Sequence, residues 1–176
     1  MEKENEERMG IRKIREEGDP ILTKKCRPVE KMNLRTKILI QDMFETMYHA
    51  YGVGLAGPQV GVLRRLCVID VDGEHPYVFI NPEIIEQSGE QTGEEGCLSI
   101  PGMCALVTRP EHVKVRALDI NMEPFELEAD GLLARACCHE FDHLDGIMYP
   151  SRALEPIHPV DQGEDEDEDE APEDEL

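Results

Sequence analysis

The chain has 176 residues, of which 40% are hydrophobic, and a formal net charge of −21 at pH 7. This length and composition suit one globular domain with a sizeable core, and the apolar stretches are shorter than the ~18–20 residues that cross a bilayer. Residues 161–176 hold 11 acidic residues and neither Lys nor Arg, so the rest of the chain still carries −10. The charge argues against direct nucleic-acid binding, and the short apolar stretches argue against a membrane protein.

The N-terminus and the cysteines indicate the cellular setting. Residues 1–8 are charged and contain no apolar segment of the kind found in secretory signals, so we expect a cytoplasmic protein. The six cysteines of such a chain are more often buried side chains, catalytic groups or metal ligands than disulfides. We expect Cys26 and Cys67 to be small buried residues.

The spacing of apolar side chains predicts two helices. Residues 34–51 repeat apolar side chains at i, i+4, with Asn33 to cap the start and Gly52 to end the helix. Residues 131–144 form the second predicted helix, with Asp130 as its cap and Gly146 close to its end. Segments rich in Val and Ile or alternating in polarity predict short strands at 66–71, 77–80, 84–85, 105–107, 113–118 and 125–129.

The order of these elements predicts the fold class. A helix, many short strands and a second helix, without regular βαβ alternation, favour an α+β domain with antiparallel sheets. We expect this single domain to span residues 1–155. Prolines and the acidic run 164–170 follow, so residues 156–176 are expected to form an acidic, disordered tail.

A metal-binding motif lies inside the second predicted helix. Residues 139–143 read His-Glu-Phe-Asp-His, an H-E-x-x-H motif. Residues four apart share a helix face, so His139 and His143 can bind one ion, with Glu140 beside them to handle the protons of a bound water. The alternative is a chance match on a charged helix.

A catalytic ion of this kind usually takes a third protein ligand, and its identity separates the classes of metalloenzyme. The metzincin pattern continues through Gly146 but needs a histidine where the chain has Tyr149. A thermolysin-like site needs a downstream carboxylate, for which Glu155 and Glu164 are the candidates. Cys97 is the best candidate, because a thiolate binds Zn²⁺ or Fe²⁺ well; the alternative is a buried loop cysteine.

Three segments resemble, in order, the signature motifs of peptide deformylases. They read Gly-Val-Gly-Leu-Ala-Gly-Pro-Gln at 52–59, Glu-Gly-Cys-Leu-Ser-Ile-Pro at 95–101 and His-Glu-Phe-Asp-His-Leu-Asp-Gly at 139–146. The resemblance also covers residues 11–30 and 79–83, and so runs from about residue 10 to 155. It implies an α+β fold with short antiparallel sheets around a central metal-binding helix and one long N-terminal helix.

The resemblance implies hydrolysis of the formyl group from the N-terminal formylmethionine of newly made polypeptides, with release of formate. Cys97, His139 and His143 would ligate one divalent ion, Fe²⁺ in most members, for which Zn²⁺, Ni²⁺ or Co²⁺ can substitute. The ion lowers the pKa of a bound water toward neutrality. The implied partners are N-formylmethionyl nascent peptides and, transiently, the ribosome.

The resemblance also implies roles for the groups around the ion. Glu140 would be the general acid and base, and Gln59 and the backbone N–H of Leu98 would stabilise the oxyanion. The backbone of Gly54 would hydrogen-bond the substrate.

A pocket for the methionine side chain is expected beside the metal-binding helix. Leu132, Arg135 and Ala136 precede His139 by seven, four and three residues and so share its face. With Val53 and the aliphatic stem of Arg135 they would line the pocket; the alternative is core packing.

The chain departs from the family pattern at three places. Gly57 stands where alanine is usual, which bears on the stiffness of the loop. Cys138 replaces a common glutamine, and with Cys137 it is expected to pack in the core. Cys104 stands where some relatives have a substrate-contacting arginine, so Arg109 or the main chain would take over that contact.

Two functions other than deformylation are alternatives for this sequence. The first is a metalloprotease of the H-E-x-x-H type, which would cleave internal peptide bonds. The second is a non-catalytic metal module whose acidic tail binds a basic partner. A closed structural site needs neither Glu140 nor Gln59, so these two residues argue against the second function.

Overall fold

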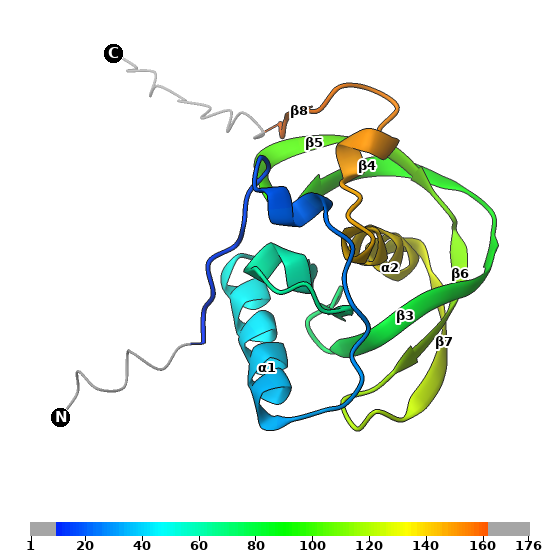
Figure 1. Ribbon diagram of the computed structural model, residues 1–176. Helices are drawn as coiled ribbons and strands as arrows, with labels where there is room; N and C mark the ends of the chain where they lie inside the picture. The colour runs from blue at the N-terminus through cyan, green and yellow to red at the C-terminus, as the bar shows by residue number, and fades with distance from the viewer. Residues whose placement is uncertain (1–9, 162–176) are drawn as a thin grey trace, which may run out of the picture.

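The computed structural model describes residues 10–161, which form two helices and two antiparallel sheets (Figure 1). Helix α1 spans Leu34–His49 and helix α2 spans Gly131–Leu144. Three 3-10 turns lie in the described part of the chain: η2 (Pro20–Thr23), η3 (Gly57–Val60) and η4 (Tyr149–Arg152).

The strands form one sheet of five and one of three. The first has the order β1-β2-β3-β6-β7, with bounds Gly54–Ala56, Leu66–Ile69, Tyr77–Ser88, His112–Leu118 and Pro124–Asp130. The second has the order β4-β5-β8, with bounds Gln91–Cys97, Ile100–Arg109 and His158–Pro159. Every neighbouring pair is antiparallel. The predicted α+β class with antiparallel sheets is therefore confirmed.

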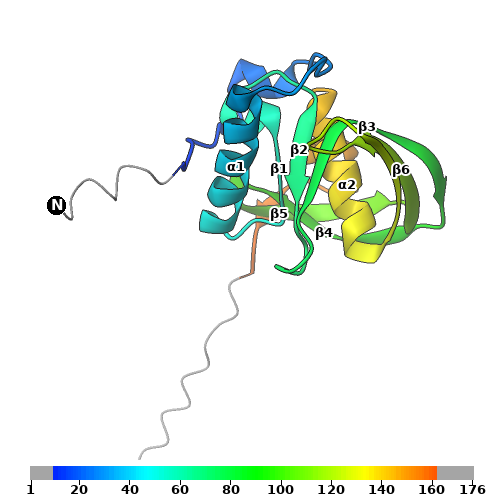
Figure 2. The same ribbon diagram turned by 90° about the horizontal axis from the view of Figure 1, so that it is seen from below.

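Strand β2 separates two of the three hydrophobic clusters of the described residues. Leu66 and Val68 pack in the cluster that contains residues of α1, whereas Cys67 and Ile69 pack in the cluster that contains residues of α2. Successive side chains of a strand point to opposite faces, and Figure 2 shows α1 and α2 on either side of β1 and β2. Because helices cover both faces, all four residues of β2 are buried.

Helix ends agree only partly with the prediction. The Asn33 side chain accepts a hydrogen bond from the Thr36 N–H (2.9 Å) and caps α1 as expected. The helix ends at His49, and the left-handed residue that follows is Tyr51 (φ 57°), not Gly52. Asp130 precedes α2, but its side chain makes no capping bond and contacts His112 instead.

Strands β1, β4 and β8 were not predicted. Strand β4 lacks apolar alternation because its sequence is Gln-Thr-Gly-Glu-Glu-Gly-Cys, and it is held by pairing with β5. Strand β8 lies beyond residue 155 and pairs His158 with Cys104. The predicted acidic run 164–170 lies outside the described residues. The limits of domain and tail, 1–155 and 156–176, stay predictions.

The length and hydropathy of the two helices show whether either could span a membrane. Within residues 10–161, neither helix is long and apolar enough to cross a membrane.

Candidate active site

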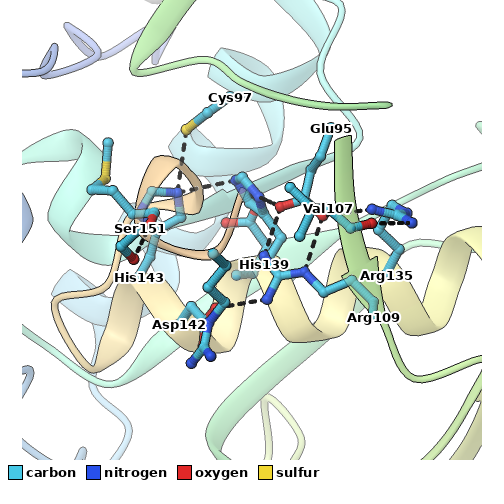
Figure 3. Close-up of polar contacts among 12 residues, drawn as sticks. Glu95, Cys97, Val107, Arg109, Arg135, His139, Asp142, His143 and Ser151 are labelled. Atoms are coloured by element: carbon cyan, nitrogen blue, oxygen red, sulfur yellow. Dashed lines mark hydrogen bonds and ion pairs between the residues drawn. The ribbon is translucent and has the colours of Figure 1, made fainter. Parts of the chain in front are cut away.

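Three metal-ligating side chains from two distant segments converge beside α2 (Figure 3). His139 and His143 lie one turn apart on α2, with 3.2 Å between their Nε2 atoms. Cys97, the last residue of β4, places its Sγ 3.3 Å from His143 Nε2. The three ligand atoms all lie within 4.8 Å of one another.

The donor set fits a divalent ion. Two imidazole nitrogens that bind one tetrahedral ion at about 2.0–2.1 Å lie about 3.4 Å apart, and the observed separation is 3.2 Å. The Nδ1 atom of His143 is buried and has no hydrogen-bond partner. Hydrogen bonding alone therefore stabilises the His139–His143 pair only a little. One thiolate and two imidazoles suit Fe²⁺ or Zn²⁺ better than Mg²⁺ or Ca²⁺.

Glu95 fixes the orientation of His139. Its Oε2 lies 2.8 Å from His139 Nδ1, which turns the Nε2 lone pair toward His143. Arg109 and Arg135 each donate to the Glu95 carboxylate, at 2.6 Å and 3.0 Å for their shortest contacts. Burial raises the pKa of Glu95, but the hydrogen bonds from His139 and Arg109 outweigh it and lower the pKa to about 2. The carboxylate is therefore ionised throughout the physiological range.

The arginine beside Glu95 extends this network to the end of α2. Arg109 Nη1 lies 2.7 Å from Asp142 Oδ2, and Asp142 in turn binds Arg152 of η4. Arg109 is only 4% exposed. The expectation that Arg109 contacts the substrate backbone is therefore wrong, because its guanidinium is occupied by the buried carboxylate of Glu95 and the partly buried carboxylate of Asp142.

Glu140 is a buried carboxylate at the edge of a cleft. It is 4% exposed, and its Oε2 atom has no hydrogen-bond partner. Burial raises the pKa of Glu140 to about 7, and a cation held by Cys97 and the two histidines would lower that pKa. Its burial and its place in the cleft make Glu140 a candidate for proton transfer.

Gln59 lies behind Cys97 and is held in one orientation. Its Oε1 accepts a hydrogen bond from the Ala56 N–H (3.0 Å), which directs Nε2 toward Ser99 Oγ (3.1 Å) and Cys97 Sγ (3.5 Å). Leu98, the next residue after Cys97, lines the cleft. Gln59 and Leu98 therefore both lie next to Cys97, one of the three candidate metal ligands.

The cleft has a volume of about 570 Å³. Its lining includes Cys97, Leu98, His139, Glu140 and the five predicted substrate-binding residues, Val53, Gly54, Leu132, Arg135 and Ala136. Val53 and Leu132 are exposed, whereas Ala136 and Arg135 are 6% and 7% exposed and form a deeper part. All sequence-predicted site residues thus lie in or directly beside one cleft.

Other predicted residues lie elsewhere. Glu155 binds His158 and is not part of the cluster around Cys97. Cys26, Cys67, Cys137 and Cys138 are buried, as expected. A Cβ atom on Gly57 would lie 2.7 Å from the Val62 carbonyl oxygen, so the loop closes more tightly than an alanine allows.

The roles of Glu95 and Asp142 in the network were not predicted from the sequence. Glu95 precedes Cys97 by two residues, and side chains two apart in a strand share a face. That spacing was the one local signal for Glu95. The contacts of Asp142 depend on Arg109 and Arg152, which no spacing along the chain connects to it.

Comparisons with known proteins agree with this geometry. The sequence profile of the polypeptide deformylase family matches residues 11–157. The peptide deformylase of Lachnoclostridium phytofermentans is 55% identical over 162 residues, which cover 91% of this chain and 99% of the relative. That of Agathobacter rectalis is 56% identical over 152 residues, covering 86% and 96%.

Solved structures give the same answer for the fold. The crystal structure of a peptide deformylase from Legionella pneumophila matches with a TM-score of 0.79 and 48% identity, over 81% of this chain and 85% of that one. The peptide deformylase from Thermotoga maritima matches with a TM-score of 0.79 and 44% identity, over 81% and 97%. The chain therefore belongs to the polypeptide deformylase family.

Proposed function

We propose that Cys97, His139 and His143 hold the divalent ion with which this peptide deformylase hydrolyses N-formylmethionyl peptides, and that Glu140 moves the proton. The main support is the buried Glu140 carboxylate, whose Oε2 has no partner and which lines the same cleft as the three converging donors. A buried carboxylate without a hydrogen-bond partner is costly for stability alone. A proton-transfer role explains why it is kept.

The reaction divides between the ion and the side chains around it. A divalent ion held by the two imidazoles and the thiolate would make a water molecule nucleophilic at neutral pH. Glu140 accepts the proton that this water loses and passes it to the departing amine, so that formate and a free N-terminus result.

Negative charge on the formyl oxygen needs donors that are already in place. The Gln59 amide is fixed by the Ala56 N–H and lies beside Cys97, and we assign it and the Leu98 N–H to this oxyanion. Loss of one such donor typically costs about 10²–10³ in rate.

The substrate would be held by the cleft. We assign the methionine side chain to the surface made by Val53, Leu132, Ala136 and the aliphatic stem of Arg135, all of which line the cleft. We assign hydrogen bonds to the peptide backbone to the main chain of Gly54.

The finer features of the family resemblance complete the proposal. Helix α2 is the central metal-binding helix, α1 is the long N-terminal helix, and Fe²⁺ is the working ion. The enzyme works in the cytoplasm and meets the ribosome transiently, since a net charge of −21 opposes lasting adhesion to ribosomal RNA. We assign residues 1–155 to the catalytic domain and 156–176 to an acidic tail, whose residues 158–159 pair with β5 as strand β8.

Glu140→Gln is the decisive variant. We expect its kcat on a formyl-Met peptide to fall by 10²–10⁴-fold, while metal bound through Cys97 and the histidines is retained. Glu128→Gln, on an exposed part of β7, is the matched control and should behave as wild type. Normal turnover by Glu140→Gln would overturn the assigned role. Cleavage of internal peptide bonds by the wild type would instead favour a metalloprotease.

A further inference from the structure

A second group of metal-ligating side chains lies at the rim of the cleft. Glu94, Cys104 and His158 offer a carboxylate oxygen, a sulfur and an imidazole nitrogen, all within 4.8 Å of one another. The three residues come from β4, β5 and β8, the three strands of one sheet. Glu94 also lines the cleft, so this group lies beside the deformylase site without sharing a residue with its three ligands.

The distances suit a single ion. Cys104 Sγ lies 3.9 Å from His158 Nδ1, across the β5–β8 pairing in which these residues are partners. A sulfur and a nitrogen that bind one tetrahedral Zn²⁺ at about 2.3 Å and 2.05 Å lie about 3.5 Å apart. A shift of a few tenths of an ångström, on the short strand β8, closes the difference.

His158 is oriented as a ligating histidine usually is. Its Nε2 lies 3.0 Å from Glu155 Oε1, and the same oxygen accepts from the Leu106 N–H (3.3 Å). A carboxylate on one ring nitrogen fixes the tautomer and leaves the other nitrogen for the metal. That other nitrogen, Nδ1, faces Cys104 and also lies 3.1 Å from the Pro159 carbonyl oxygen, to which it donates when the ring is protonated.

The charges around Cys104 favour a cation. Burial, and then Glu94, Asp161 and Glu155, raise the pKa of the Cys104 thiol. Among residues 10–161, no Lys or Arg forms a salt bridge with any of these three carboxylates. A protonated His158 offsets only one negative charge. A divalent ion offsets more and stabilises the thiolate that binds it.

We propose that Glu94, Cys104 and His158 form a second site for a divalent transition metal of the Zn²⁺ or Co²⁺ class, separate from the deformylase ion. Sulfur, imidazole and carboxylate donors together select this class of ion. Because the ligands come from three strands, the bound ion ties β8 to the rim of the cleft. Water completes the coordination.

The test is a metal titration of the full chain. The wild type, Cys104→Ser and His158→Gln are dialysed against Co²⁺, and bound cobalt is measured by elemental analysis and by thiolate-to-cobalt absorption. We expect two ions per wild-type chain and one in each variant. Cys97→Ala should keep one ion, and adding His158→Gln to it should remove that ion.

The controls match the ligands in type and environment. Cys26→Ser removes a thiol that is 5% exposed, as Cys104 is. His112→Gln removes an imidazole that lies beside Asp130 and Glu128 but near no cysteine of the proposed site. Both controls should bind two ions. The wild-type Tm should rise when the second equivalent binds, and that of His158→Gln should not.

Two results would overturn the second site. One is a wild-type chain that takes up a single ion. The other is a second ion that Cys104→Ser and His158→Gln bind as tightly as the wild type. If Cys104→Ser does not fold, His158→Gln decides, because the His158 side chain is 40% exposed and its loss leaves no cavity in the core.

Discussion

Gly54 of β1 lies directly against the Glu140 carboxylate of α2. A Cβ atom on Gly54 would be 2.7 Å from Glu140 Oε1 and 2.8 Å from its Cγ. Only glycine allows this approach of strand and carboxylate, so one residue without a side chain sets the position of Glu140.

Gly54→Ala should therefore displace Glu140. We expect kcat to fall by about 10²-fold, since a displacement of about 1 Å at a reacting group costs that much. Steady-state kinetics on a formyl-Met peptide, with metal content measured on the same sample, checks this. Gly93→Ala is the control, because its added Cβ would meet only an ordinary contact at 3.5 Å. An unchanged kcat in Gly54→Ala would show that the contact does not position Glu140.

Glu95→Gln should weaken metal binding more than it slows chemistry. The amide cannot accept from His139 with the strength of a carboxylate. Arg135 loses its charged partner, and Arg109 keeps only Asp142. Loss of such a supporting group typically costs 10–100-fold in metal affinity. Competition with a chelator gives the affinity, and kcat measured at saturating metal should change less. Equal losses in both quantities would contradict a positioning role.

Ala136→Leu should narrow the deeper part of the cleft. Ala136 is 6% exposed and lines the cleft three residues before His139. One methylene more or less in a hydrophobic substrate pocket changes the discrimination between two substrates by about 1–3 kcal/mol. We expect the ratio of kcat/KM for formyl-Met over formyl-Ala peptides to fall at least about tenfold. If both substrates lose equally, Ala136 is only a packing residue.

Tyr48 should lose its proton unusually late. Tyr48 is 45% exposed, but partial burial of its hydroxyl and the hydrogen bond that it donates to Asp70 raise the pKa of Tyr48 to about 12. A folded-state pKa above the unfolded value of about 10 stabilises the fold at low and neutral pH, and this stabilisation is lost as the pH rises from 10 to 12. Burial also raises the pKa of Tyr149 to about 12, so tyrosinate absorbance should show two late-titrating groups, of which one disappears in Tyr48→Phe and titrates earlier in Asp70→Asn. An unchanged titration of Tyr48 in Asp70→Asn would show that Asp70 does not raise the pKa of Tyr48.

The proposed ferrous ion should make the enzyme sensitive to air. A thiolate that binds Fe²⁺ brings an oxidisable sulfur and an oxidisable metal together. Anaerobic purification with metal analysis, followed by timed activity assays in air, should show faster inactivation of iron-loaded than of zinc- or nickel-loaded protein. Equal lifetimes would count against Fe²⁺ as the working ion.

The features that could be predicted from the sequence are those that residue spacing over a few positions determines. Both helices were predicted to within a few residues because their apolar residues repeat at helical spacing, and α2 has the predicted bounds. His139 and His143 are four residues apart, so helical geometry alone brings them together. Cys97 was the best candidate for the third ligand because a thiolate binds Zn²⁺ or Fe²⁺ well, and the order of the three family motifs implied the same ligand.

The features that could not be predicted from the sequence depend on tertiary contacts. Strand β4 escaped prediction because its buried inward position is Glu95, a charged residue that Arg109 and Arg135 neutralise from other elements. Arg109 looked available for substrate because the sequence does not reveal Asp142 and Glu95 on either side of it. Strand β8 is two residues long and is defined only by its pairing with β5.

The buried charges along β4 and β5 also disfavour pairing of these strands in the wrong register. A slip of one residue between these strands would turn Glu95 to the solvent, leaving Arg135 buried without its carboxylate partner and moving Cys97 away from the histidines. Burying an unpaired charge is strongly destabilising, by about 3–5 kcal/mol. A misregistered chain would thus be destabilised and could not form the proposed metal site, so metal content would report whether refolded protein has the correct register.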